Sequence, residues 1–121
     1  MLLCDDRADA MIDGETPVEI HDEVVAWMET LDDHAWDRTV IVIDRLAVLG
    51  STARMPLSRS LGGGVFELRF TLDATARRIT YRFARDGRLV LLTTFFKQRN
   101  NERREIARAR LAAADCVRRH R

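Results

Sequence analysis

Three apolar runs separated by very short turn signals constrain the fold of this chain more than any other feature of its sequence. The runs are Val65–Leu72, Arg78–Ala84 and Leu89–Phe96, and the stretches between them contain "DATA" and "RDG". Asp86-Gly87 is a strong hairpin signal. Parallel strands need a longer crossover, so three consecutive strands with such short connections predict an antiparallel meander.

Helical periodicity flanks the meander on both sides. Apolar residues recur at helical spacing in residues 21–31 and again in residues 35–49, where Gly50 is the expected stop. The short break between these two helices predicts an antiparallel hairpin. A last helix is expected after Asn100 or Asn101. The predicted fold class is therefore α+β, with an N-terminal helical hairpin packed on an antiparallel β-meander and a C-terminal helix.

The length of 121 residues fits one domain. Residues 1–17 form an acidic N-terminal segment that could include a short edge strand, and residues 18–121 are expected to form the single domain. Residues 51–64 are predicted to be a loop that ends in Gly62–Gly64. These glycines precede a strand and no Gly-Lys-Ser/Thr follows, so they match neither a Walker loop nor a dinucleotide fingerprint. We expect them to let the backbone turn into the strand.

Charge is distributed very unevenly along the chain. Residues 1–37 hold 12 acidic and one basic side chain, a net charge of −11, whereas residues 38–121 hold 7 acidic and 19 basic ones, a net charge of +12. This asymmetry predicts a basic surface that faces a polyanion such as nucleic acid. A general bias towards arginine would explain why 19 of the 20 basic residues are Arg, but not why the acids crowd one end.

Other classes of protein are disfavoured by what the sequence lacks. No apolar run approaches the roughly 18 residues of a membrane span, and the start has no basic segment followed by an apolar core. We therefore expect a cytoplasmic protein. Cys4 and Cys116 lie far apart, and the three histidines are scattered, so the sequence predicts no metal site and no disulfide framework.

Strand alternation predicts a cationic face on the meander. The apolar residues at alternate positions, including Tyr81, are expected to face the helices. The charged residues between them then share the opposite face, together with Lys97 after the third strand: Glu67, Arg69, Arg78 and Arg82. Cations outnumber acids there, which favours an anion site. The alternative is an ordinary solvated face, whose Glu–Arg pairs contribute about 0.2–1 kcal/mol each.

The order of several short motifs matches a known family. "FELR", a "YRF" strand, "FFKQ" and an "EIARAR" helix follow one another within residues 54–110. In this the chain resembles the HigB-like branch of the RelE/ParE toxin superfamily, which includes phage-derived, host-killer-like toxins. The resemblance implies a RelE-like fold and a toxin of a type II toxin–antitoxin module, which cuts mRNA in the ribosomal decoding site. It also implies a helix-turn-helix antitoxin as partner and no cofactor.

The resemblance also implies roles for individual residues of a metal-independent endoribonuclease. Arg69 matches the Arg of "ELR", Lys97 the Lys of "F-x-K", and Arg82 the basic residue of the "YR" strand. These cations suit attack by a 2′-hydroxyl, in which the phosphorane charge must be neutralised. Glu67 is either the base or an orienting group for Arg69, and Lys97 would act as base if neutral and as acid if protonated. Further RNA contacts are expected from Arg54, Arg59, Arg78 and Arg99.

Two other functions remain open at this point. One is a ParE-like inhibitor of DNA gyrase, and the other is a nucleic-acid-binding or partner-binding domain without catalytic activity. The acidic residues 1–37 could partly mask the basic face, bind a basic surface of the antitoxin, or only keep the protein soluble. Gln98 stands where the family often has a second Lys, and Arg99 is expected to compensate.

Overall fold

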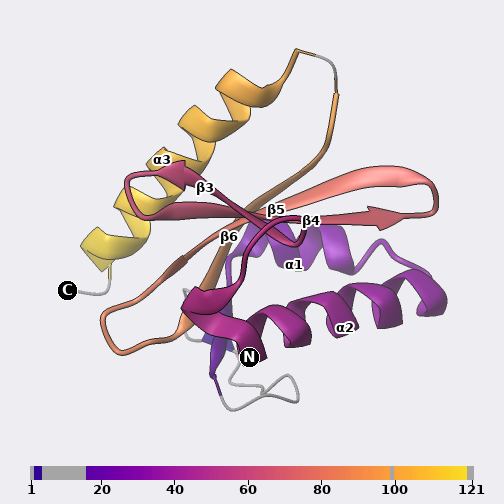
Figure 1. Ribbon diagram of the computed structural model, residues 1–121, viewed down its shortest axis with the longest axis horizontal. Helices are drawn as coiled ribbons and strands as arrows, with labels where there is room; N and C mark the ends of the chain where they lie inside the picture. The colour runs from indigo at the N-terminus through magenta and orange to yellow at the C-terminus, as the bar shows by residue number, and fades with distance from the viewer. Residues whose placement is uncertain (1, 4–15, 99, 120–121) are drawn as a thin grey trace.

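The computed structural model describes residues 2–3, 16–98 and 100–119, and these residues form a mixed sheet with helices on both faces (Figure 1). Most of the predicted acidic segment lies outside the described residues, so its boundary at residue 17 stays a prediction. The elements in chain order are β1 (Leu2–Leu3), β2 (Val18–Ile20), α1 (Asp22–Met28), α2 (Asp33–Leu49), the short 3-10 helix η1 (Gly50–Thr52), β3 (Ser58–Gly62), β4 (Val65–Leu72), β5 (Thr75–Phe83), β6 (Leu89–Phe96) and α3 (Glu102–Arg119).

The predicted α+β class is correct, but the sheet is larger than a meander. Its six strands run in the order β1-β2-β6-β5-β4-β3. The expected antiparallel β4–β5–β6 meander forms the middle of the sheet. Beside it, β2 pairs with β6 in parallel, and β1 pairs with β2 in parallel at the edge. The sheet is therefore mixed, and the predicted antiparallel meander is only its central part.

A loop was predicted over residues 51–64, but this stretch contains β3 and is therefore not a continuous loop. This strand pairs antiparallel with β4, and the pairing of Gly62 with Val65 leaves Gly63 and Gly64 as a two-residue turn. Both turn residues have positive φ, at 65° and 80°, which is the backbone of a primed hairpin turn. Two glycines of the triplet, Gly63 and Gly64, thus form the turn of the β3–β4 hairpin, and Gly62 ends β3.

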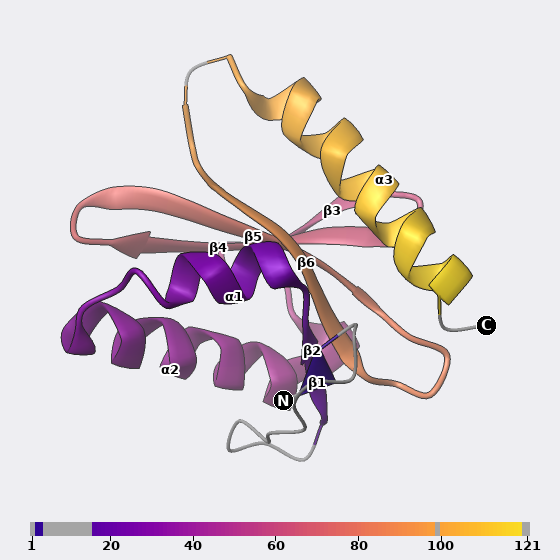
Figure 2. The same ribbon diagram turned by 180° about the vertical axis from the view of Figure 1, so that it is seen from behind.

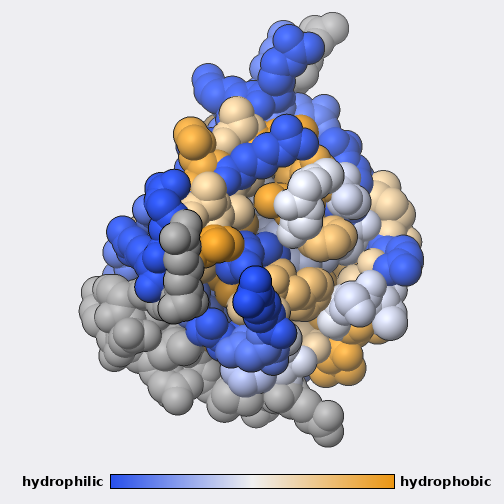
Figure 3. Space-filling model, turned by 90° about the vertical axis from the view of Figure 1, so that its left-hand side faces the viewer, coloured by the Kyte–Doolittle hydropathy of each residue, from blue (hydrophilic) through white to orange (hydrophobic). Residues whose placement is uncertain are grey.

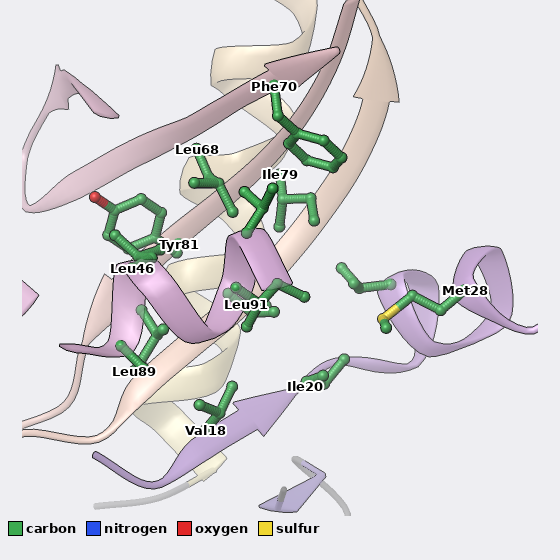
Figure 4. Close-up of a cluster of buried hydrophobic side chains, with 14 of the residues drawn as sticks. Val18, Ile20, Met28, Leu46, Leu68, Phe70, Ile79, Tyr81, Leu89 and Leu91 are labelled. Carbon is green, nitrogen blue, oxygen red and sulfur yellow. The ribbon is translucent and has the colours of Figure 1, made fainter. Parts of the chain in front are cut away.

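Helices α1 and α2 lie side by side against one face of the sheet (Figure 2). Asp32 caps α2 by accepting a hydrogen bond from the Ala35 N–H at 2.8 Å, and Gly50 ends it with a φ of 56°. The main core forms between these helices and the strands, and Figure 4 shows Leu46 beside Tyr81 within the same cluster as Leu68, Ile79 and Leu91. The predicted assignment of the apolar strand positions to this face is confirmed.

Helix α3 covers part of the opposite face and builds a second, smaller core there. Ala109 and Cys116 of α3 are buried against Val65 of β4 and against Val90 and Leu92 of β6. In Figure 1, α3 lies on one side of the sheet and α2 on the other. The charged face predicted from strand alternation is therefore only partly open to solvent. Among the described residues, none of the helices combines the length and apolar character needed to cross a membrane.

Candidate nucleic-acid interface

Pairing between β4 and β5 brings three of the predicted site residues together. Arg69 lies directly opposite Arg78 in the register, and Glu67 lies two residues along β4 on the same face. The Glu67 carboxylate Oε1 is 3.6 Å from Arg78 Nε and 3.9 Å from Arg69 Nε. Glu67 is only 4% exposed, whereas Arg69 keeps about a quarter of its side chain in solvent. One buried carboxylate therefore holds two guanidinium groups from neighbouring strands.

The local charges explain why Glu67 is needed at this position. Like charges directly opposite each other on a sheet destabilise it, and Arg69 and Arg78 form such a pair. Burial lowers the pKa of Arg78, the charge of Arg69 lowers it further, and Glu67 opposes both effects. Arginine stays protonated in proteins. The repulsion between the two guanidinium groups is therefore reduced by the carboxylate and not by loss of a proton. Glu67 thus permits two cations to share one face.

Strand β3 and the start of α3 add a second ion pair beside the first. Arg59 lies opposite Glu67 in the β3–β4 register, and its guanidinium donates to the carboxylate of Glu102 in the first turn of α3. The hydrogen bond from Arg59 lowers the pKa of Glu102, and the charges of Arg59, Lys97 and Arg69 lower it further. Glu102 was missed by the sequence analysis. An acid in the first turn of a helix that begins beside a predicted cation was the available signal.

Lys97 joins this group from the end of β6. Its backbone N–H donates to the Ala76 carbonyl at 2.7 Å, which extends the β5–β6 pairing by one step. Phe95 lies opposite Arg78, so Lys97, two residues further on, returns to the same face. The side chain is exposed, and its Nζ donates to the Gln98 carbonyl at 3.2 Å. We call Arg59, Arg69, Arg78 and Lys97, with the carboxylates of Glu67 and Glu102, the cationic cluster.

Arg82 lies outside the cationic cluster as defined above, and its predicted catalytic role stays a prediction. It shares the face of the cluster, but it lies four residues along β5 from Arg78, about 13 Å at the usual rise of a strand. There its Nη1 is 3.7 Å from Cys116 Sγ in the second half of α3. The Gly63–Gly64 turn lies at this same end of the sheet. Alternation predicted the face correctly, but not the position along the strand.

The remaining predicted RNA contacts divide into one that borders the cluster and one outside the described residues. Arg54 is exposed, and its guanidinium donates to the carbonyls of Ser51 and Ala53. The loop that carries it approaches Arg69, because Arg69 Nη1 is 3.2 Å from Met55 Sδ. Arg99 lies in the gap between residues 98 and 100, so its predicted role stays a prediction.

A comparison with protein families identifies the chain at the level of family. The model of phage-derived protein Gp49-like (DUF891) matches residues 26–114, which include every member of the cationic cluster. The chain belongs to this Gp49-like family. The family is part of the RelE-like group of type II toxin–antitoxin toxins. Among curated proteins, none matches this sequence.

In this Gp49-like protein the single tyrosine is part of the core, as predicted. Tyr81 is 1% exposed and stacks on Phe66 with ring centroids 5.4 Å apart. Its hydroxyl shares a hydrogen bond with Ser58 Oγ of β3. Burial raises the pKa of Tyr81, and the hydrogen bond with Ser58 partly opposes the rise. The hydroxyl is therefore held as a neutral structural group.

The arrangement of the cationic cluster suits a phosphate rather than a metal ion. Arg59, Arg69 and Lys97 all act on the partly exposed carboxylate of Glu102, so an anion that reaches this carboxylate lies within range of three cations. Planar guanidinium groups bind phosphate oxygens in pairs, and lysine adds a mobile charge. Within the described part of the chain, the group of side chains suited to a metal is Glu19, His21 and Cys116, which lies near Arg82 instead.

Proposed function

We propose that this protein is the toxin of a type II toxin–antitoxin module, of the HigB-like branch, and that it cleaves messenger RNA on the ribosome. The observation that carries the proposal is the cationic cluster, in which four cations from β3, β4, β5 and the end of β6 surround two carboxylates. The excess positive charge is unbalanced until an anion arrives, and the RNA backbone supplies such an anion at each nucleotide.

RNA binding would begin when a phosphate replaces the Glu102 carboxylate as the partner of Arg59. The ion pair between Arg59 and Glu102 is about 40% exposed on both sides, so water and salt reach it readily. Exposed pairs contribute little to stability, about 0–1 kcal/mol, and a phosphate can displace Glu102 from Arg59 at low cost. Glu67 stays in place during this exchange because it is buried between Arg69 and Arg78. It therefore orients Arg69 towards the phosphate without contacting RNA itself.

The chemistry that fits this cluster is attack by the 2′-oxygen of a nucleotide on the adjacent phosphorus. The P–O5′ bond breaks as the new P–O2′ bond forms, leaving a 2′,3′-cyclic phosphate and a 5′-hydroxyl. The proton lost by the 2′-hydroxyl must be accepted, and the departing 5′-oxygen must gain one. Arg69 and Arg59 neutralise the charge that develops on the phosphorane oxygens, the term that usually dominates such catalysis.

We assign proton transfer to Lys97 and Glu102, the members of the cluster other than arginine that reach solvent. Lys97 is exposed, and we assign it the role of proton donor to the 5′-oxygen. Glu102 is the partly exposed carboxylate of the cluster, and we assign it the role of accepting the proton of the 2′-hydroxyl. The Arg59 hydrogen bond is the main cause of its lowered pKa, so displacement from Arg59 by the phosphate makes Glu102 a better base, while most of the rate enhancement is still expected from charge stabilisation. We assign Glu67 the orienting role, which its burial supports.

A helix-turn-helix antitoxin is the partner that this proposal requires. An adjacent short reading frame that encodes such a protein would support it. Co-expression should then relieve growth arrest, and the two proteins should copurify. If the neighbouring product neither binds the chain nor restores growth, the toxin–antitoxin assignment fails.

An experiment in cells separates message cleavage from inhibition of gyrase. We expect expression of the wild type to arrest growth and to produce new message ends within translated regions, with plasmid supercoiling unchanged. The Lys97→Ala variant should lose both the arrest and the new ends. If the wild type and Lys97→Ala both arrest growth, with intact messages and reduced supercoiling, the gyrase function is established instead.

A further inference from the structure

A second group of chemically reactive side chains lies at the opposite end of the sheet from the cationic cluster. The ligand atoms of Glu19, His21 and Cys116 all lie within 4.8 Å of one another. Glu19 is on β2, His21 directly precedes α1, and Cys116 is in the second half of α3. Glu19 and Cys116 are buried, at 0% and 1% exposure, while His21 is half-buried. Almost a hundred residues of chain separate the first two from the third.

The fold sets the orientation of the Glu19 carboxylate. Arg88, from the turn between β5 and β6, donates to its Oε1 at 2.7 Å. The other oxygen, Oε2, is 3.6 Å from Cys116 Sγ. One oxygen is therefore held by a guanidinium, while the second faces the thiol. Carboxylates that bind metals are commonly held in this way by an outer partner, which fixes the direction of the ligating oxygen.

We propose that Glu19, His21 and Cys116 form a binding site for a zinc ion. One carboxylate oxygen, one imidazole nitrogen and one thiolate sulfur are ligands that zinc accepts in proteins. The thiolate and the carboxylate together balance the two positive charges of the ion. Three protein ligands leave a fourth position, and His21 opens onto a hollow of about 250 Å³ that Asp22 and Asp115 also line. Water can occupy that position.

The surrounding charges are compatible with this assignment. Arg88 is paired with both Glu19 and Asp86, and Arg119 is paired with Asp115 at 3.2 Å. Arg82 Nη1 lies 3.7 Å from Cys116 Sγ. Figure 3 faces this end of the molecule, where hydrophilic residues predominate.

The ion would have a structural role, since it lies near Arg82 rather than in the cationic cluster. It would join the β2–α1 junction to the second half of α3, which pack on opposite sides of the sheet edge. Such a link stabilises the native state because the unfolded chain does not hold the three ligands together. The proposal is independent of the RNA chemistry, and the two can fail separately.

Titration of the full-length protein with zinc tests the proposal. After removal of metal by a chelator, we expect the wild type to bind one zinc ion per chain and to unfold at a higher temperature. His21→Ala and Cys116→Ser should each weaken binding at least tenfold, since each removes a ligand. Cobalt should give a thiolate-to-metal charge-transfer band that Cys116→Ser abolishes. His34→Ala, which changes an exposed histidine of α2, should bind zinc as the wild type does.

Circular dichroism shows whether each variant is folded before titration. If the buried Cys116→Ser change prevents folding, His21→Ala alone decides, because His21 is half-buried and lies outside the helix. The proposal is overturned if the folded wild type binds no zinc stoichiometrically. It is equally overturned if the folded His21→Ala protein binds zinc as tightly as the wild type, or if His34→Ala loses the site.

Discussion

The role of Glu67 is interpreted differently from the sequence and from the structure. As part of "FELR" it is equally a candidate base or an orienting group. Its position between Arg69 and Arg78, at 4% exposure, leaves it no surface for substrate. Alternation along a strand places a residue on a face, but burial depends on the neighbouring strands and on α3. The sequence alone therefore could not choose between the two roles.

Replacement of Glu67 tests its orienting role. We expect Glu67→Gln to lower the free energy of unfolding by about 1–3 kcal/mol, because two guanidinium groups lose their shared partner. Message cleavage should fall about 10–100-fold as Arg69 loses its fixed direction. Glu67→Asp keeps the charge and should therefore show a smaller fall in both stability and message cleavage. Chemical denaturation and cleavage kinetics measure both effects, with the exposed Glu29→Gln as control. Wild-type kinetics for Glu67→Gln would exclude the role.

Tyr81 offers a direct measurement because it is the only tyrosine of the chain. Ultraviolet absorbance of tyrosinate should report a pKa above the ordinary value of about 10, since burial favours the neutral phenol. Ser58→Ala should raise the pKa further, because the Ser58 hydrogen bond lowers it. The raised pKa in the folded state means that stability is complete below about pH 10 and falls as the pH rises above it. Titration at the ordinary value would show that Tyr81 is exposed.

At the scale of elements, the helices and the three central strands were predictable because their signals are local. Apolar periodicity, Gly50 and Asp86-Gly87 lie within the segments that they define. Strand β3 was missed because "SRSLG" has few residues typical of strands. It is a strand because β4 offers a partner and because Ser58 and Leu61 are buried there. Contacts between segments decide such cases, and one sequence does not display them.

The β4–β5 turn predicts a stabilising substitution. Asp73 and Ala74 have positive φ, at 49° and 64°, a backbone that costs a residue with a side chain about 1–2 kcal/mol. Ala74→Gly is therefore expected to raise the free energy of unfolding by about 1 kcal/mol. Gly63→Ala, at a φ of 65° in the β3–β4 turn, should lower it by a similar amount. Urea denaturation measures both. Equal free energies of unfolding for the wild type, Ala74→Gly and Gly63→Ala would contradict this account of the turns.

At the scale of the whole molecule, the two faces of the sheet differ in what covers them. The cationic cluster lies on the α3 face, and α1 and α2 cover the other. Sequence reasoning identified Arg59, Arg69, Arg78, Lys97 and Glu67 individually. It could not show that Glu102 joins them or that Arg82 stands apart, because both depend on where α3 crosses the sheet.

The separation of Arg82 from the cationic cluster gives a prediction that opposes the family-based expectation. Arg82→Ala should retain message cleavage within about threefold of the wild type, since Arg82 lies about 13 Å along the strand from Arg78. RNA affinity should also change little. Kinetics on ribosome-bound message provide the comparison. A loss as large as that expected for Arg69→Ala would place Arg82 in the site and would require a different arrangement of the bound RNA.

The most direct test of the central claim is the rate of message cleavage by Arg69→Ala in a purified translation system. Arg69 is the cluster arginine that is held by Glu67 and still open to solvent. Loss of one group that stabilises the transition state typically costs about 100–1,000-fold, and this is the expected fall in rate. Arg45→Ala, an equal loss of charge on the exposed side of α2, should cleave at the wild-type rate. Cleavage by Arg69→Ala at the rate of Arg45→Ala would contradict the assignment of the cationic cluster as the nuclease site.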